Sequence, residues 1–458
     1  MATLIFTVSF FALIAWGAVR IIRWLVRKDE EFGNIDRIRN LKTFEGRNET
    51  ALALSRLVRE DGAGEWPPRS SHYALPTYFQ AYQDIYMELI LSLSTASPSL
   101  NDAENEQRIT KFRGNMRRLL CERINIPDIR AALARVESGE NSHLPPDVYN
   151  AIYSCIAVCR HAYRWGSIPV VKFAQLETVV DFPPELDAPW PYLQRHFGVE
   201  ADSGNNTANV LLNFDEKGKR VYEINVGMSD LIRSSEEAFF RMFFDVEVLA
   251  FPIYYEIVSA IVAFEDGRKN DSLKNLQNVT RRLRELLLIF YHNLKESHVS
   301  HSVWLSYVQG FQGWGVGRVI DGKFVKYDGL SGNHVLFFQA VDAFLGLDRY
   351  LTDENMDRYI PVNQRDFCSA LRKYSIRTRL HGKDDLPLKN EIGKIVNYMK
   401  VFRAAHKTRV KSYLKQPAPE RLIMTAGKSV LENQHTHGFE DAYKTLDDMM
   451  AARLEVTI

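Results

Sequence analysis

The chain has 458 residues, of which 46% are hydrophobic and 25% charged, an ordinary globular mix that excludes disorder along the whole length. Lys and Arg number 58 against 57 Asp and Glu, and a net charge of +1 does not indicate a nucleic-acid partner. This length favours two domains over a single core. The 4 cysteines are too few and too scattered for a disulfide scaffold, which favours a reducing compartment.

The N-terminus carries an uncharged apolar run over residues 3–19, followed by Arg20, Arg23, Arg27 and Lys28. The run approaches the length of a membrane-spanning helix. Because the basic residues follow the apolar stretch, a cleaved signal is disfavoured and the body of the protein is expected on the cytoplasmic side. We therefore expect residues 1–28 to form a single-pass membrane anchor, with an interfacial amphipathic segment as the alternative. No other segment is expected to approach the length of a membrane-spanning helix.

Beyond residue 28, apolar residues recur mostly at helical spacing. The pattern predicts helices over residues 78–94, 107–124, 145–165, 238–264, 272–296, 334–347 and 390–414. Residues 183–206 are rich in Pro, Gly and Asn and predict irregular structure. Lys-Gly and Asp-Gly turns predict two small hairpins, over residues 214–226 and 317–329.

These elements predict an all-α fold with minor β-hairpins. We expect two helical domains, a small one over residues 29–230 and a larger one over residues 231–458. The chain shows no internal repeat that would indicate a solenoid.

The last long helix places apolar residues and His406 on one stripe, and most histidines in such a stripe are structural. Asp342 lies in another apolar helix and needs a cationic partner if it is buried. Arg403, one turn before His406, is a candidate partner that would lock the two helices together and orient the imidazole. A lone histidine without a nearby Cys or second His does not suit zinc, but it suits the proximal side of a haem. The alternative is an Asp–Arg pair beside a histidine without a functional role.

Six segments, in order along the chain, resemble the indoleamine 2,3-dioxygenase family of haem enzymes, which insert O2 across the indole C2–C3 bond of tryptophan. They are HAYRWG at 161–166, FFRMFFDVEV at 239–248, GLSGNHVLFFQAVDAFLGL at 329–347, MDRYIPVNQRDF at 356–367, FRAAH at 402–406 and TAGKS at 425–429. The resemblance covers roughly residue 145 to the C-terminus.

The resemblance implies a haem b cofactor in the larger domain, with O2 and an indole as the small-molecule partners and a product of the N-formylkynurenine type. By family position, His406 would be the proximal iron ligand, with Asp342 and Arg403 as the pair behind it. Ser331 would lie in the loop beside the haem. The residues implied for the substrate pocket are Phe239, Phe243 and Thr425, the last on a closing loop.

The sequence also departs from the family pattern. Phe243 stands at the family's distal serine position, and Asn206 lies near the position of its pocket tyrosine. Val308 replaces the arginine that grips the substrate carboxylate, and Val303 stands near the preceding phenylalanine. A carboxylate in a dry pocket needs a cation or equivalent donors. Either another group therefore holds it, or the substrate is a decarboxylated or larger indole.

Three alternatives remain open from the sequence. A related haem enzyme would carry out another indole reaction such as a rearrangement, a haem protein would bind O2 without turnover, and a helical scaffold would bind no haem at all. The other histidines near these segments are expected to be solvated loop or helix-end residues, with His334 the one most worth testing. They are His298, His301, His334, His435 and His437.

Overall fold

The computed structural model describes residues 33–414 apart from 95–98, 100, 141–142 and 167–176, and beyond residue 414 only positions 424–425, 428–429, 444, 448, 450–452, 454–455 and 457. It is mostly helical, with two small two-stranded sheets. The predicted anchor, residues 1–28, lies outside the described residues, as do His435 and His437.

The first half of the chain contains the helices α2 (Glu49–Arg59), α3 (Thr77–Ser94), α4 (Asp102–Arg123), α5 (Ile126–Glu137), α6 (Pro146–Trp165), α8 (Pro184–Asp187), α9 (Trp190–Phe197) and α10 (Asn206–Asn209). The second half contains α11 (Asp230–Glu265), α12 (Lys269–Asn293), α13 (His301–Val303), α14 (Leu336–Phe344), α15 (Asp353–Tyr359), α16 (Val362–Lys373) and α17 (Leu386–Leu414). Single 3₁₀ turns are η1 (His72–Ala74), η2 (Leu211–Asn213), η4 (Gly310–Gln312), η5 (Gly332–His334), η6 (Arg377–Arg379) and η7 (Lys383–Asp385), and η3 (Trp304–Gln309) is a π-helical turn. The strands are β1 (Gly317–Ile320), β2 (Lys323–Lys326), β3 (Met424–Thr425) and β4 (Lys428–Ser429).

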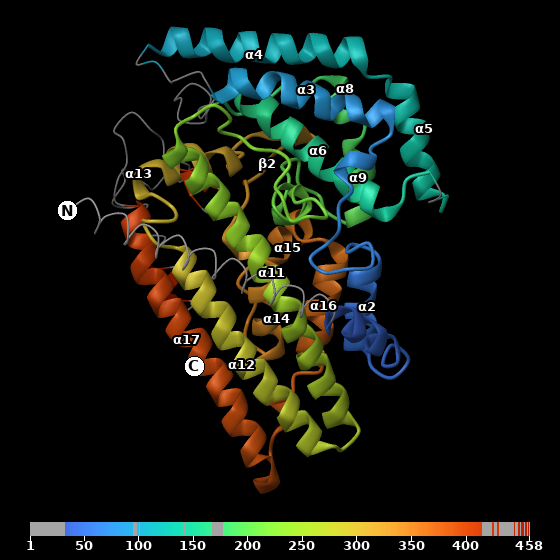
Figure 1. Ribbon diagram of the computed structural model, residues 1–458, viewed down its shortest axis with the longest axis vertical. Helices are drawn as coiled ribbons and strands as arrows, with labels where there is room; N and C mark the ends of the chain where they lie inside the picture. The colour runs from blue at the N-terminus through green and yellow to red at the C-terminus, as the bar shows by residue number, and fades with distance from the viewer. Residues whose placement is uncertain are drawn as a thin grey trace, which may run out of the picture.

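Two groups of helices build the molecule (Figure 1). In one, α3 packs on α4 and α6, and α5 packs on α9. In the other, the long helices α11, α12 and α17 lie side by side, and α14 packs against α11 and α16. One contiguous cluster of buried hydrophobic residues runs through both groups. The helical fold class predicted from periodicity is therefore confirmed, while the domain boundary at residue 230 stays a prediction.

Helix α11 is a long, apolar helix of the second group. Among the described residues it is the one helix long and apolar enough to cross a membrane, so the expectation that no segment beyond the N-terminus reaches membrane length was wrong. Its most apolar window is 72% buried, and α12 and α14 pack against it. Since a helix that is hydrophobic on all sides is also what a protein core requires, we interpret α11 as a core helix.

The hairpin predicted at the Asp-Gly turn is confirmed. Strands β1 and β2 pair antiparallel, with Ile320 opposite Lys323. Asp321 and Gly322 both have positive φ, 50° and 77°, as a two-residue hairpin turn with the twist of the strands requires.

The hairpin predicted over residues 214–226 does not form. Only an isolated bridge joins Phe214 to Arg220, around a turn in which the Asp215 carboxylate accepts hydrogen bonds from two backbone N–H groups. Beyond the bridge, the backbone N–H of Tyr222 donates to the Asn213 side chain and that of Ile224 donates to the Glu236 carboxylate. Side chains therefore take the hydrogen bonds that a second strand would have used.

Residues 183–206 were expected to be irregular, and this was wrong in part because α8 and α9 form there. Prolines lie in the first turn of both helices, where a missing N–H costs nothing. Gly198 ends α9 in the left-handed conformation, with φ 62°. The same Pro and Gly residues that suggested a loop serve here as helix boundaries.

Helix α2 packs against α16 and α11, and the contact contains a buried acid. Asp61, just after α2, is 4% exposed, and its carboxylate accepts a hydrogen bond of 2.6 Å from the Asn363 amide on α16. Burial raises the pKa of Asp61 to about 7, against a smaller lowering by that hydrogen bond, and the nearby charges of Glu60 and Asp366 raise it further. The folded protein therefore holds a proton here that the unfolded chain releases near pH 4.

Because the pKa of Asp61 is higher in the folded state, its contribution to stability is complete below pH 4 and is lost as pH rises through about 7. Asp61→Asn keeps an acceptor for Asn363 and removes the charge. We expect the variant to gain on the order of 1–3 kcal/mol over the wild type at about pH 8, and little at about pH 4. Urea unfolding of both proteins across this range measures the difference. A difference that does not change with pH would contradict the assignment.

Candidate functional site

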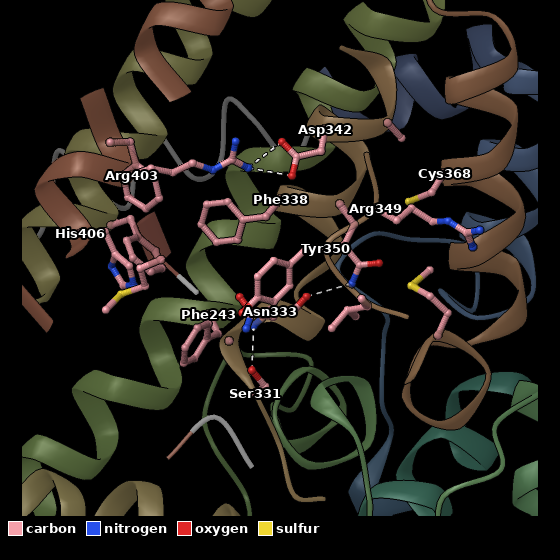
Figure 2. A pocket seen from close by; sticks show the side chains of 18 of the residues that line it. Phe243, Ser331, Asn333, Phe338, Asp342, Arg349, Tyr350, Cys368, Arg403 and His406 are labelled. Carbon is pink, nitrogen blue, oxygen red and sulfur yellow. Dashed lines mark hydrogen bonds and ion pairs between the residues drawn. The ribbon is translucent and has the colours of Figure 1, made fainter. Parts of the chain in front are cut away.

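A large cavity opens between α11, α12, α14, α16 and α17, with a volume of about 820 Å³. This is within the usual range for sites that bind a cofactor or small molecule. Figure 2 shows the side chains that converge on it from these elements. Its apolar part is walled by aromatic side chains from five separate segments: Phe239, Phe243, Phe290, Trp304, Phe338 and Phe402.

His406 lines this cavity from α17, as the apolar stripe predicted. Its ring stacks on Phe402, with centroids 5.7 Å apart, and lies against Phe290 at 5.9 Å. The imidazole makes no hydrogen bond with any described residue, and Nδ1 is buried against protein atoms. Burial lowers the pKa of His406 to about 4, so the ring is neutral at pH 7. Nε2 is thus the nitrogen left for a ligand.

The ion pair expected between α14 and α17 forms. Arg403 Nη2 lies 2.6 Å from Asp342 Oδ1 and 2.7 Å from Oδ2, and Nη1 donates to Thr457 Oγ1 at 2.5 Å. Both side chains are largely buried, 11% and 7% exposed. Burial lowers the pKa of Arg403 to about 10, which leaves the guanidinium charged at pH 7. No hydrogen bond joins the pair to His406, so it fixes α17 against α14 and does not orient the imidazole directly.

Ser331 lies in the loop that borders the cavity, at the start of η5. Its hydroxyl oxygen accepts a hydrogen bond of 3.2 Å from the Asn333 backbone N–H, which leaves the hydroxyl proton free to donate into the cavity. Its own backbone N–H donates to Nδ1 of His334, 3.4 Å away. His334 stacks on Tyr359 at 4.9 Å, and burial lowers its pKa to about 3. His334 is therefore a buried, neutral residue that holds the Ser331 loop, and the expectation of a solvated loop histidine was wrong.

The wall formed by α11 carries Phe239 and Phe243, one turn apart, with ring centroids 5.1 Å apart in an edge-to-face contact. Phe243 also contacts Phe290 on α12. At the position where the family has a distal serine, this cavity thus presents an apolar ring.

The positions flagged as family departures do not face the cavity. Val308 and Val303 are buried, and neither is among the described lining residues. Asn206 is likewise buried, in α10, away from the cavity lining. Trp304 lines the cavity from the π-helical turn η3, its ring edge-on to Phe239 and Tyr413. Sequence alignment missed Trp304 because a π turn shifts which residues share a helix face.

Thr425, expected on a closing loop, belongs to β3, which pairs with β4 and packs against η3. Of the other histidines, His298 is exposed and contacts His292, and the His301 ring lies 2.8 Å from Glu296. His298 follows the end of α12 and His301 begins α13, so both lie at the loop or helix-end positions that were expected.

A sequence model of the indoleamine 2,3-dioxygenase family matches residues 66–447. The chain belongs to the indoleamine 2,3-dioxygenase family. The match begins well before residue 145, where the resemblance was first visible, and so includes α3, α4 and α5. No curated protein matches the chain.

Membership establishes, at family level, a haem dioxygenase of the tryptophan and indole type. The cavity fits such a cofactor, because it combines a neutral imidazole that has no hydrogen bond, aromatic walls and a buried cation. Among the described residues there is no group of three or more metal-ligating side chains. A haem needs a single axial side chain from the protein, and His406 is the candidate among the residues that line the cavity.

The Asp342–Arg403 pair generates a stability prediction. Asp342→Asn leaves a buried guanidinium without its carboxylate, and we expect the free energy of unfolding to fall by about 3–5 kcal/mol. Replacing both residues, Asp342→Leu with Arg403→Met, removes the unpaired charge and should recover most of the loss. Glu285→Gln breaks an exposed pair on α12 and serves as the control, with an expected change below about 1 kcal/mol. Chemical denaturation measures all three, and a double variant no more stable than Asp342→Asn would contradict the explanation.

Proposed function

We propose that the protein holds haem b in this cavity through His406 and catalyses O2 insertion across the C2–C3 bond of an indole. The observation that carries the proposal is the neutral imidazole without a hydrogen-bond partner, directed at an aromatic cavity. Because Nδ1 is buried against protein atoms, Nε2 is the ring nitrogen through which His406 could bind a ligand in the cavity. Family membership supports the same cofactor.

In this proposal the chain's own residues have separate tasks. His406 Nε2 is the axial ligand, and the Phe290 and Phe402 rings limit its rotation. The bound haem supplies an iron that binds and activates O2. Phe239 and Phe243 provide the aromatic faces that hold a flat indole and exclude water. Ser331 offers a hydroxyl donor at the edge of the site.

The class of substrate depends on whether the cavity offers a cation that can bind a substrate carboxylate. Val308 stands where the family has the arginine that binds the substrate carboxylate, and its side chain is buried outside the cavity lining. At this position of η3 the chain therefore offers no cation to a substrate carboxylate. The substrate is then either tryptophan held by another cation of the cavity or an indole without a free carboxylate, such as tryptamine. The loss of a distal hydroxyl at Phe243 favours, as a second candidate, a haem protein with a different indole reaction or with O2 binding alone.

His406→Ala removes the axial nitrogen, and we expect its Soret absorbance per protein to fall at least about tenfold after expression with ample porphyrin precursor. Phe243→Ala enlarges the cavity without changing the proposed iron ligand His406, and this variant should keep the haem. His298→Ala replaces an exposed histidine and is the control. The same wild-type preparation, given tryptophan or tryptamine with a reductant and air, should yield a product heavier by two oxygen atoms in mass spectrometry.

A His406→Ala protein that still carries haem would show that the wrong ligand was chosen. A wild-type protein without Soret absorbance would contradict the haem proposal. A haem-containing protein that oxygenates no indole would exclude the dioxygenase and support the O2-binding alternative.

We also propose that residues 1–28 anchor the protein in a membrane with its body on the cytoplasmic side. Its support is the sequence pattern of an apolar run followed by four basic residues. The full chain should then remain in the membrane pellet after an alkaline carbonate wash, and a variant that lacks residues 1–28 should be recovered in the supernatant. Release of the full chain by the wash would instead favour an interfacial segment.

A further inference from the structure

The cavity extends beyond its aromatic part into a second region that neither the family pattern nor the haem proposal uses. This region, which we call the arginine lobe, is lined by Arg349, Tyr350, Cys368, Ser369 and Arg372. Figure 2 shows Arg349 and Cys368 on the far side of Tyr350 from His406. The lobe is formed by the segment after α14 together with one face of α16.

Five other charged residues among those described line the cavity near the arginine lobe, and each is in an ion pair: Asp353, Asp357, Arg365, Asp366 and Lys373. Arg349 forms an ion pair with Asp353 at 2.7 Å, and the neighbouring Lys373 pairs with Glu49 at 2.7 Å. Arg372 donates one hydrogen bond to the Leu347 carbonyl, and no carboxylate among the described residues lies within ion-pair distance of it. A half-buried guanidinium thus points at a cavity with most of its N–H donors unused.

The electrostatic environment of Arg372 favours an added negative charge. Burial lowers its pKa and the positive charge of Arg349 lowers it further, against smaller opposing effects of Cys368 and Asp348. Arg349 is exposed and paired with Asp353, so the half-buried Arg372 is the guanidinium that gains most from an added anion, which would also use its unmet hydrogen-bond donors. Guanidinium groups match a carboxylate best, because their planar N–H pairs reach both oxygens.

We propose that Arg372, assisted by Arg349, binds a carboxylate of the ligand that fills this cavity. Two sources have this chemistry, a propionate of the haem and the carboxyl group of an indole acid. Arg372 on α16 would then do what the family's arginine does, since the position of that arginine in η3 is occupied by Val308. The inference rests on the proposed function for its ligands, and the two can fail separately because carboxylate binding is measurable without turnover.

The test compares acid and neutral probes on Arg372→Gln. Apoprotein is titrated with haem and with haem dimethyl ester, followed by the Soret band. Both apoprotein and haem-loaded protein are titrated with indole-3-acetate and with 3-methylindole, followed by calorimetry. We expect Arg372→Gln to weaken one acid probe at least about tenfold while its neutral partner changes less than about twofold. The weakened probe identifies the source of the carboxylate.

Lys373→Gln removes the same charge at the next position, where the lysine is paired with Glu49, and is the matched control with an expected change below about twofold. Arg349→Gln, at an exposed residue, should give a smaller loss in the same direction and serves if Arg372→Gln is poorly folded. Arg372→Lys should recover part of the affinity because it keeps the charge.

The proposal is wrong if neither acid probe binds the wild type more tightly than its neutral partner, or if a folded Arg372→Gln protein binds both acids as the wild type does. In the second case Arg372 only caps the Leu347 carbonyl. If the wild type binds no haem but Arg372→Gln still weakens indole-3-acetate, the proposed function fails while the arginine lobe stands.

Discussion

The buried ion pair between Asp342 and Arg403 joins α14 to α17, and the position of α17 determines the whole candidate site. His406 has no hydrogen bond to hold it, so its place depends on the register of its helix and on the rings beside it. A shift of one residue along α17 would rotate the imidazole by about 100° around the helix axis and turn it away from the cavity. The charge pair makes such a shift expensive, because it would separate two buried charges.

The cavity divides into an aromatic part and a cationic part, and the division has chemical consequences. Around His406 the walls are rings from α11, α12, α14 and α17, which exclude water and keep the imidazole neutral. Toward α16 the lining becomes charged, and Arg372 lacks an acidic partner among the described residues. A flat apolar ligand with an acidic end would satisfy both parts at once. In our proposal the cation that binds the acidic end of a ligand therefore comes from α16 and not from the turn at Trp304.

The sequence predictions failed where side chains, and not periodicity, determine the backbone. Residues 214–226 alternate as a hairpin should, but the Asn213 and Glu236 side chains take the backbone hydrogen bonds. His334 reads as a loop histidine, but it stacks on Tyr359, which is distant in the sequence. Trp304 was not singled out from the sequence, and it lines the cavity from a π-helical turn. None of these contacts leaves a signal at short range along the chain.

The sequence by itself determined the helical class, the stripe that carries His406, the need of Asp342 for a cation and the family likeness. These follow from local periodicity and from the cost of burying an unpaired charge, which hold for any packing of the helices. Only the tertiary structure decided that His406 has no hydrogen bond, that Arg372 faces the cavity without an acid, and that Val308 does not face it. Each of these depends on which atoms of distant segments come within a few ångströms, and that is set by how α11, α14, α16 and α17 pack together.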